Sequence, residues 1–86
     1  MITIRLPRML SETAGVDLVH GVNGETVGAA FDDLFVRFPG LGNHILDEKR
    51  QVRPHVSVFV DGEQADLHTG VQPGSEIRVL HAVSGG

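Results

Sequence analysis

The apolar and polar positions of the chain follow two periods, and the change between them marks the expected elements. Residues 1–6 alternate between apolar and polar side chains, which is typical of a strand with one buried face. Residues 16–22 alternate less regularly and predict a second strand, antiparallel to the first. Between them, Met9 and Leu10 are expected to tuck under the sheet, and residues 11–15 are expected to form a loop.

One amphipathic helix is predicted after the turn at Asn23-Gly24. Thr26 is a suitable N-cap, because its hydroxyl can accept a hydrogen bond from a backbone amide of the first turn. The helix is expected to end near Phe38, because Pro39 disfavours helical geometry in the residue before it. Its apolar stripe consists of Val27, Ala30, Phe31, Leu34 and Phe38.

The second half of the chain returns to the period of strands. Residues 41–53 are irregular, with a helical turn expected at 44–47 and a solvated loop at 47–53. Residues 55–60 predict a strand whose valines at positions 56, 58 and 60 face the core. Asp61-Gly62 is a hairpin turn signal, followed by a short return strand at 64–67 and a last strand at 76–82.

The order strand, strand, helix, strand, short strand, strand predicts an α+β protein with the β-grasp fold. A helix and a sheet can each bury one apolar face, so the compact solution is one main helix packed across a mixed sheet of four to five strands. We expect a single domain over residues 1–82, followed by a flexible C-terminal diglycine tail at 83–86.

Composition narrows the classes of function. The 86 residues carry a net charge of −4, and the seven Lys and Arg residues are scattered, which argues against nucleic acid as a partner. No apolar run is long enough to cross a membrane, and no signal peptide is evident, so a cytoplasmic location is expected. The absence of cysteine excludes disulfides and thiolate metal sites.

The polar residues do not suggest an active site within the chain. The five histidines include no pair at helical i, i+4 spacing, so no metal site is expected and solvated histidines are the simpler interpretation. Asp32 and Asp33 are neighbours on the helix and should point in different directions. No serine has an evident base beside it. The sequence therefore predicts a protein that is not itself an enzyme.

An exposed apolar patch is predicted on the outer face of the sheet. If Val58 and Val60 face the core, Phe59 points away from it, and the same alternation leaves Leu80 outside. An aromatic residue and a leucine on adjacent strands form the kind of patch that protein partners bind, so both are candidate partner-binding residues. Scattered surface apolar residues are the alternative interpretation.

Several short segments, in this order, resemble the ubiquitin-like sulfur carriers of the MoaD/ThiS family along the whole chain. They are Thr26-Val27-Gly28, Phe38-Pro39-Gly40, Val60-Asp61-Gly62-Glu63, Pro73-Gly74-Ser75-Glu76-Ile77 and Ala82-Val83-Ser84-Gly85-Gly86. The additional residues at 41–54 make the chain longer than the thiamine-type carriers. In this it is more similar to the molybdopterin synthase small subunit and the cysteine-biosynthesis sulfur carrier. His81 is a departure, because relatives often have proline before the tail.

The resemblance implies a carrier cycle with two protein partners. An ATP-dependent activating enzyme adenylates the Gly86 carboxylate, a sulfur donor displaces AMP to leave a thiocarboxylate, and a downstream enzyme accepts the sulfur. The chain itself would bind no cofactor, ATP being used by the activating enzyme. Val83, Ser84 and Gly85 would form the tail, and Phe59 and Leu80 would contact both partners.

Two other functions and several pathways stay open at this stage. A ubiquitin-like modifier would use the same adenylate and join Gly86 to lysines of target proteins. A plain interaction domain would not need Gly86 at all. The acceptor pathway could make cysteine, molybdopterin or a specialised metabolite, with thiamine least favoured by the length of the chain.

Overall fold

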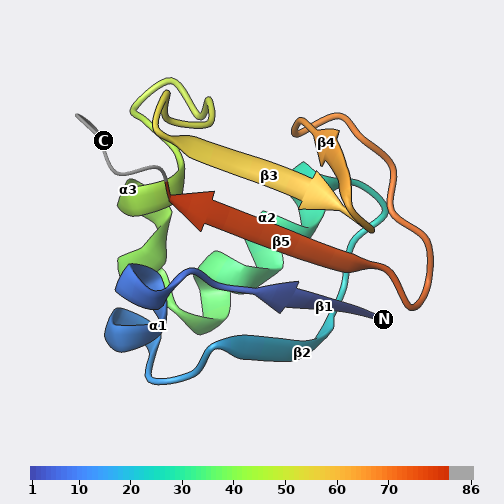
Figure 1. Cartoon of the computed structure of the whole chain (residues 1–86), viewed down its shortest axis with the longest axis horizontal. Coiled ribbons are helices and arrows are strands. Elements are labelled where there is room, and N and C mark those ends of the chain that lie inside the picture. Colours follow the sequence, from blue (N-terminus) through green and yellow to red (C-terminus); the bar gives the residue numbers. More distant parts are fainter. Residues whose placement is uncertain (82–86) are drawn as a thin grey trace.

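A five-stranded sheet with the strand order β2-β1-β5-β3-β4 forms the scaffold of the protein. The computed structural model describes residues 1–81, and Figure 1 shows one long helix packed across one face of the sheet. The elements are β1 (Ile2–Arg5), α1 (Arg8–Ala14), β2 (Leu18–Val22), α2 (Val27–Arg37), the 3-10 turn η1 (Pro39–Leu41), α3 (Gly42–Ile45), β3 (Val56–Val60), β4 (Glu63–Ala65) and β5 (Glu76–His81).

Strand β5 occupies the centre of the sheet. It pairs in parallel with β1 and antiparallel with β3, while β2 and β4 form the two edges by antiparallel pairing. The last strand in sequence is therefore enclosed by the first and the third, and α2 lies behind them in Figure 1. This mixed sheet confirms the predicted α+β β-grasp fold and the antiparallel pairing of the first two strands.

Helix α2 is the main helix that the apolar spacing predicted. Val27, Ala30, Phe31 and Leu34 are fully buried against the sheet, whose inner face contributes strand residues such as Ile4 and Ile77. Burial of such side chains contributes about 1.5–3 kcal/mol each, which makes this layer the main source of stability. The helix ends at Arg37, with Phe38 as its C-cap, as predicted.

The first connection was predicted incorrectly. Residues 11–15 do not form a loop, because α1 continues to Ala14 and Gly15 closes it in the left-handed conformation at φ 82°. The amide of Gly15 donates to the Ser11 carbonyl at 2.8 Å, which satisfies one of the free carbonyls at the helix end. Of the two residues expected beneath the sheet, Leu10 is buried but Met9 is 51% exposed.

Smaller differences concern the ends of elements. The helical turn expected at 44–47 lies two residues earlier, at α3, and follows directly from η1. Residues 16 and 17 precede β2 rather than belonging to it, and the return strand β4 ends at Ala65. Val56 and Val58 are buried as predicted, whereas Val60 at the end of β3 is only half-buried.

Replacing the N-cap of α2 tests the local origin of this helix. The Thr26 hydroxyl accepts a hydrogen bond from the Ala29 amide at 3.1 Å. Thr26→Ala leaves that amide unsatisfied and should lower the free energy of unfolding by about 1 kcal/mol, measured by urea denaturation. Thr26→Ser keeps the hydroxyl and is the matched control. Equal losses in both variants would show that the hydroxyl is not the stabilising group.

Candidate docking face

The outer face of β3 and β5 presents the two apolar residues expected there. Ile77 and Val79 of β5 are buried, whereas Leu80 is 42% exposed on the opposite face. In the β3–β5 register Phe59 lies opposite Arg78, and Ser57 lies opposite Leu80. Because alternate residues of a strand share a face, Phe59 and Leu80 lie on the same side of the sheet, away from α2. The prediction that they bind partners is not tested by this arrangement.

A shallow depression of about 610 Å³ joins these residues to the turn beside them. We call this surface the docking face; its lining residues are Phe59, Asp61, Gly62, Glu76, Arg78 and Leu80. An apolar floor beside charged groups suits a protein partner, because the apolar part supplies binding energy and the charges select the orientation.

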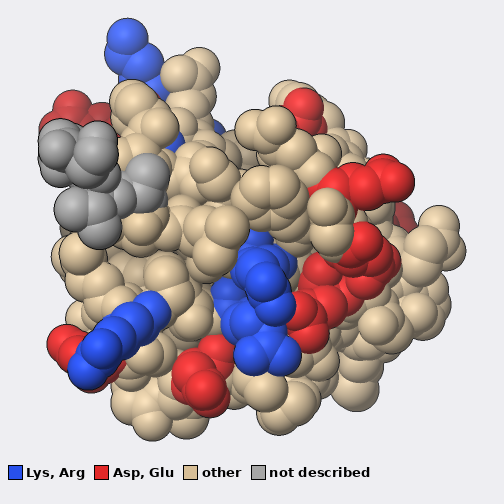
Figure 2. Space-filling model, viewed as in Figure 1, with Lys and Arg blue, Asp and Glu red and all other residues tan. Residues whose placement is uncertain are grey.

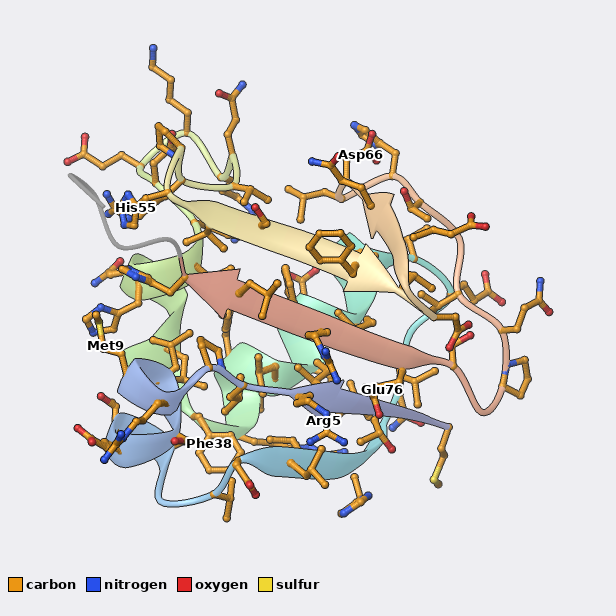
Figure 3. The ribbon with its side chains drawn as sticks, viewed as in Figure 1. Arg5, Met9, Phe38, His55, Asp66 and Glu76 are labelled. Carbon is orange, nitrogen blue, oxygen red and sulfur yellow. The ribbon has the colours of Figure 1, made fainter. Side chains whose placement is uncertain are left out.

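Glu76 and Arg78 of the docking face form a short row of charges with Arg5 of the neighbouring strand β1. Glu76 of β5 accepts from the Nε of Arg5 on β1 at 3.2 Å, and Figure 3 shows these two side chains pointing toward one another. The guanidinium of Arg78 lies 4.0 Å from the same carboxylate oxygen. Figure 2 shows Lys and Arg side chains at the middle of this face, with acidic side chains beside them. All three groups are substantially exposed, so each pair contributes little to stability.

The rim of the docking face is held by the turn between β3 and β4. Asp61 and Gly62 both have positive φ, at 49° and 89°, as the hairpin signal of these two residues predicted. The Asp61 carboxylate accepts a hydrogen bond from the backbone amide of Glu76 at 2.9 Å. The backbone amide of Asp61 donates to the Glu76 carbonyl at 3.0 Å. The turn therefore fixes the start of β5 and with it the position of Arg78.

Two histidines meet at the other end of β5. The rings of His55 and His81 are 4.6 Å apart between centroids, in an edge-to-face arrangement with an interplanar angle of 70°. Sequence reasoning missed this pair because it considered only helical spacing. Val56 is the register partner of His81, and His55 lies in the turn just before Val56. Strand alternation would place His55 and Val56 on opposite faces, so the contact depends on the turn as well as on the β3–β5 pairing.

The neighbouring acidic residues of α2 have different partners. Asp33 accepts from the Arg37 guanidinium and from the Asn23 amide, whereas Asp32 pairs with Arg50, so the two neighbours do point in different directions. Within residues 1–81 there is no group of three or more histidine and carboxylate side chains that could hold a metal ion. None of the helices in that part of the chain is long and apolar enough to cross a membrane.

Four predicted site residues lie outside the part of the chain that the structure describes: Val83, Ser84, Gly85 and Gly86. The domain boundary predicted after residue 82 lies outside it too. Comparison with known protein families gives information about these four residues. The model of the ThiS family matches residues 4–86, which is nearly the whole chain and includes both final glycines. The chain belongs to the ThiS family.

Relatives of this ThiS-family chain include both carriers and modifiers. Sulfur carrier protein CysO of Mycobacterium tuberculosis is 26% identical, over 99% of this chain and 98% of the relative. Small archaeal modifier protein 1 of Haloferax volcanii is 34% identical, over 90% of this chain and 91% of the relative. ThiS-family sulfur carriers are protein co-substrates rather than catalysts, which agrees with the expectation that this chain is not an enzyme.

Solved structures of such proteins share the fold. The crystal structure of small archaeal modifier protein 1 from Haloferax volcanii has a TM-score of 0.87 at 32% identity, covering 99% of this chain and 98% of that one. A chain in the crystal structure of the Amycolatopsis orientalis BexX/CysO complex has a TM-score of 0.89 at 26% identity, with 100% coverage of both chains. The β-grasp assignment therefore stands on the strand order and on these matches together.

Proposed function

We propose that this ThiS-family protein is a sulfur carrier that holds sulfur as a thiocarboxylate on Gly86. The observation that carries the proposal is the family match across residues 4–86, which extends through Gly85 and Gly86. The described fold is consistent with it, because β5 is the central strand and leads directly into residues 82–86. The absence of cysteine leaves no thiol in the chain to carry the sulfur instead.

The proposed cycle has two chemical steps at the Gly86 carboxylate, the first at its oxygen and the second at its carbon. The Gly86 carboxylate attacks the α-phosphate of ATP in the activating enzyme, which releases pyrophosphate and leaves an acyl-adenylate. A sulfur nucleophile at the oxidation level of sulfide then attacks the acyl carbon and displaces AMP. A carboxylate needs this activation because its oxygen is otherwise a poor leaving group. The thiocarboxylate is finally the sulfur donor to a downstream enzyme.

Glycine suits the last two positions for reasons of size and conformation. A pocket that adenylates a carboxylate must exclude water, so the segment that enters it should be thin. Glycine adds no side chain and does not restrict φ, which allows Gly85 and Gly86 to follow a narrow channel. Residues 82–86 can span at most about 17 Å beyond His81, so Gly86 can enter a pocket while the docking face stays outside it.

We further propose that the docking face binds both the activating enzyme and the downstream sulfur acceptor. Phe59 and Leu80 would be the apolar anchors, and Arg78 beside them would pair with an acidic group of the partner. Because both partners would use one surface, they would bind in turn rather than together. The existence of a BexX/CysO complex supports partner binding by a protein of similar sequence and fold.

The modifier function is the second candidate, and the 34% identity to small archaeal modifier protein 1 favours it specifically. A modifier would transfer the activated Gly86 carbonyl to lysine amines, giving amide-linked conjugates. A carrier would accumulate as a free thiocarboxylate and lose its sulfur to a small-molecule pathway. Cysteine, molybdopterin and specialised-metabolite synthesis are the candidate acceptors, and the ATP requirement suits a cytoplasmic cycle.

Reconstitution with a cognate activating enzyme tests the proposed function. Adenylation of Gly86 predicts exchange of labelled pyrophosphate into ATP that depends on this protein, and addition of sulfide should then release AMP stoichiometrically. Products are separated on denaturing gels to look for conjugates. AMP release without conjugates supports the carrier; a ladder of lysine-linked products supports the modifier. No exchange above that of the enzyme alone would contradict both.

A further inference from the structure

We propose that His55 and His81 together form a binding site for one divalent transition metal ion of the zinc, nickel or copper type. This inference goes beyond the proposed sulfur-carrier function and does not depend on it. His55 lies in the turn immediately before β3, and His81 is the last residue of β5. Figure 3 shows His55 at the end of the sheet where β5 finishes.

The spacing of the two rings matches that of a shared ion. A zinc–imidazole bond is about 2.0–2.1 Å, so each ring centre lies about 3 Å from the metal. A near-tetrahedral angle at the metal then places the two centres about 5 Å apart. The observed separation is 4.6 Å. The rings lie edge to face at 70°, so binding would rotate the side chains until one nitrogen of each ring points at the shared ion.

The turn before β3 and the β3–β5 pairing together hold the two side chains near one another. Val56 pairs with His81 at the end of β5, and the Val56 amide donates to the Arg53 carbonyl at 2.9 Å, which closes the turn that contains His55. This turn therefore holds His55 beside the end of β5. Within residues 1–81, neither imidazole is engaged in a side-chain hydrogen bond, whereas His20 contacts the Thr3 hydroxyl. No side-chain hydrogen bond within residues 1–81 therefore competes with a metal for the ring nitrogens of this pair.

The donor set selects the class of ion. Imidazole nitrogen suits zinc, copper and nickel, whereas magnesium and calcium require oxygen ligands. No third histidine or carboxylate of residues 1–81 completes the site, so the ion would keep open positions for water or for a ligand from a partner. A bound ion at this end of the sheet would also link β3 to β5.

Zinc titration of the intact protein tests the site. We expect wild-type protein to bind one equivalent of zinc, measured by calorimetry. His55→Asn and His81→Asn should each weaken that binding on the order of a hundredfold, because loss of one ligand removes the chelate effect. His68→Asn is the matched control, because His68 is exposed between β4 and β5 and lies outside the pair. The zinc affinity of this variant should equal that of the wild type.

Nuclear magnetic resonance of the wild-type protein gives a second readout that needs no variant. The ring signals of His55 and His81 should shift together as the first equivalent of zinc is added, while those of His20, His44 and His68 stay in place. Unchanged zinc affinity in either pair variant, or first shifts at another histidine, would overturn the proposal. A Gly86-deleted protein should still bind zinc normally, which separates this result from failure of the sulfur-carrier function.

Discussion

Deleting Gly86 is expected to abolish sulfur transfer while leaving the fold intact. The deletion withdraws the reacting carboxylate by one residue, which is about 3.5 Å of extended chain. A misplacement on the order of 1 Å can already cost about a hundredfold in rate, so a whole residue should reduce activity below detection. The measurement is the rate of thiocarboxylate formation with a cognate activating enzyme and a sulfur source.

Two further variants test whether displacement of the terminal carboxylate causes the loss of sulfur transfer. Appending one residue after Gly86 displaces the carboxylate in the opposite direction and should be as damaging as the deletion. Gly85→Ala adds only a methyl group and a restriction on φ, so its effect should be milder. Normal sulfur transfer by the Gly86-deleted protein would refute the carrier function and would leave an interaction domain as the better interpretation.

Phe59→Asp is expected to weaken binding to the activating enzyme and to the downstream partner by about thirtyfold or more. An anchor residue in the middle of an interface typically contributes about 2 kcal/mol, and a buried aspartate would add an unpaired charge. Phe59 is only half-buried on the outer face, so the folded structure should tolerate the change. Binding is measured by calorimetry with each partner in turn.

Val36→Asp is the matched control for this experiment. Val36 is 79% exposed on α2, the layer on the other side of the sheet from the docking face, so the same chemical change there should leave both affinities near those of the wild type. Equal affinities for wild type and Phe59→Asp would show that the partners bind elsewhere. Weakening in both variants alike would point to a general loss of folded protein.

The fold was predictable where a regular period decided the structure. The stripe from Val27 to Leu34 identified α2, and alternation identified β3 and β5. Alternation also placed Phe59 and Leu80 on one face, because the direction of a strand side chain follows from its position once one buried neighbour is known. Asp61-Gly62 predicted its turn because few residues adopt positive φ in succession.

Features that depend on tertiary contacts were harder to predict from the sequence. Helix α1 is only seven residues long, and residues 11–15 were expected to form a loop, yet burial of Leu10 and closure at Gly15 stabilise the helix. The contact of His55 with His81 brings the turn before β3 beside the end of β5, which no local spacing reveals. The pairing of Arg5 with Glu76 likewise needs β1 and β5 to be adjacent.

The central claim is that sulfur is carried on Gly86, and the mass of the intact protein tests it most directly. After co-expression with the activating enzyme and a sulfur source, the wild-type protein should gain the mass difference between one sulfur and one oxygen. Fragmentation should assign that gain to Gly86, and the Gly86-deleted protein should show none. A protein of unmodified mass under conditions that activate a known carrier, or a gain assigned to any other residue, would contradict the account.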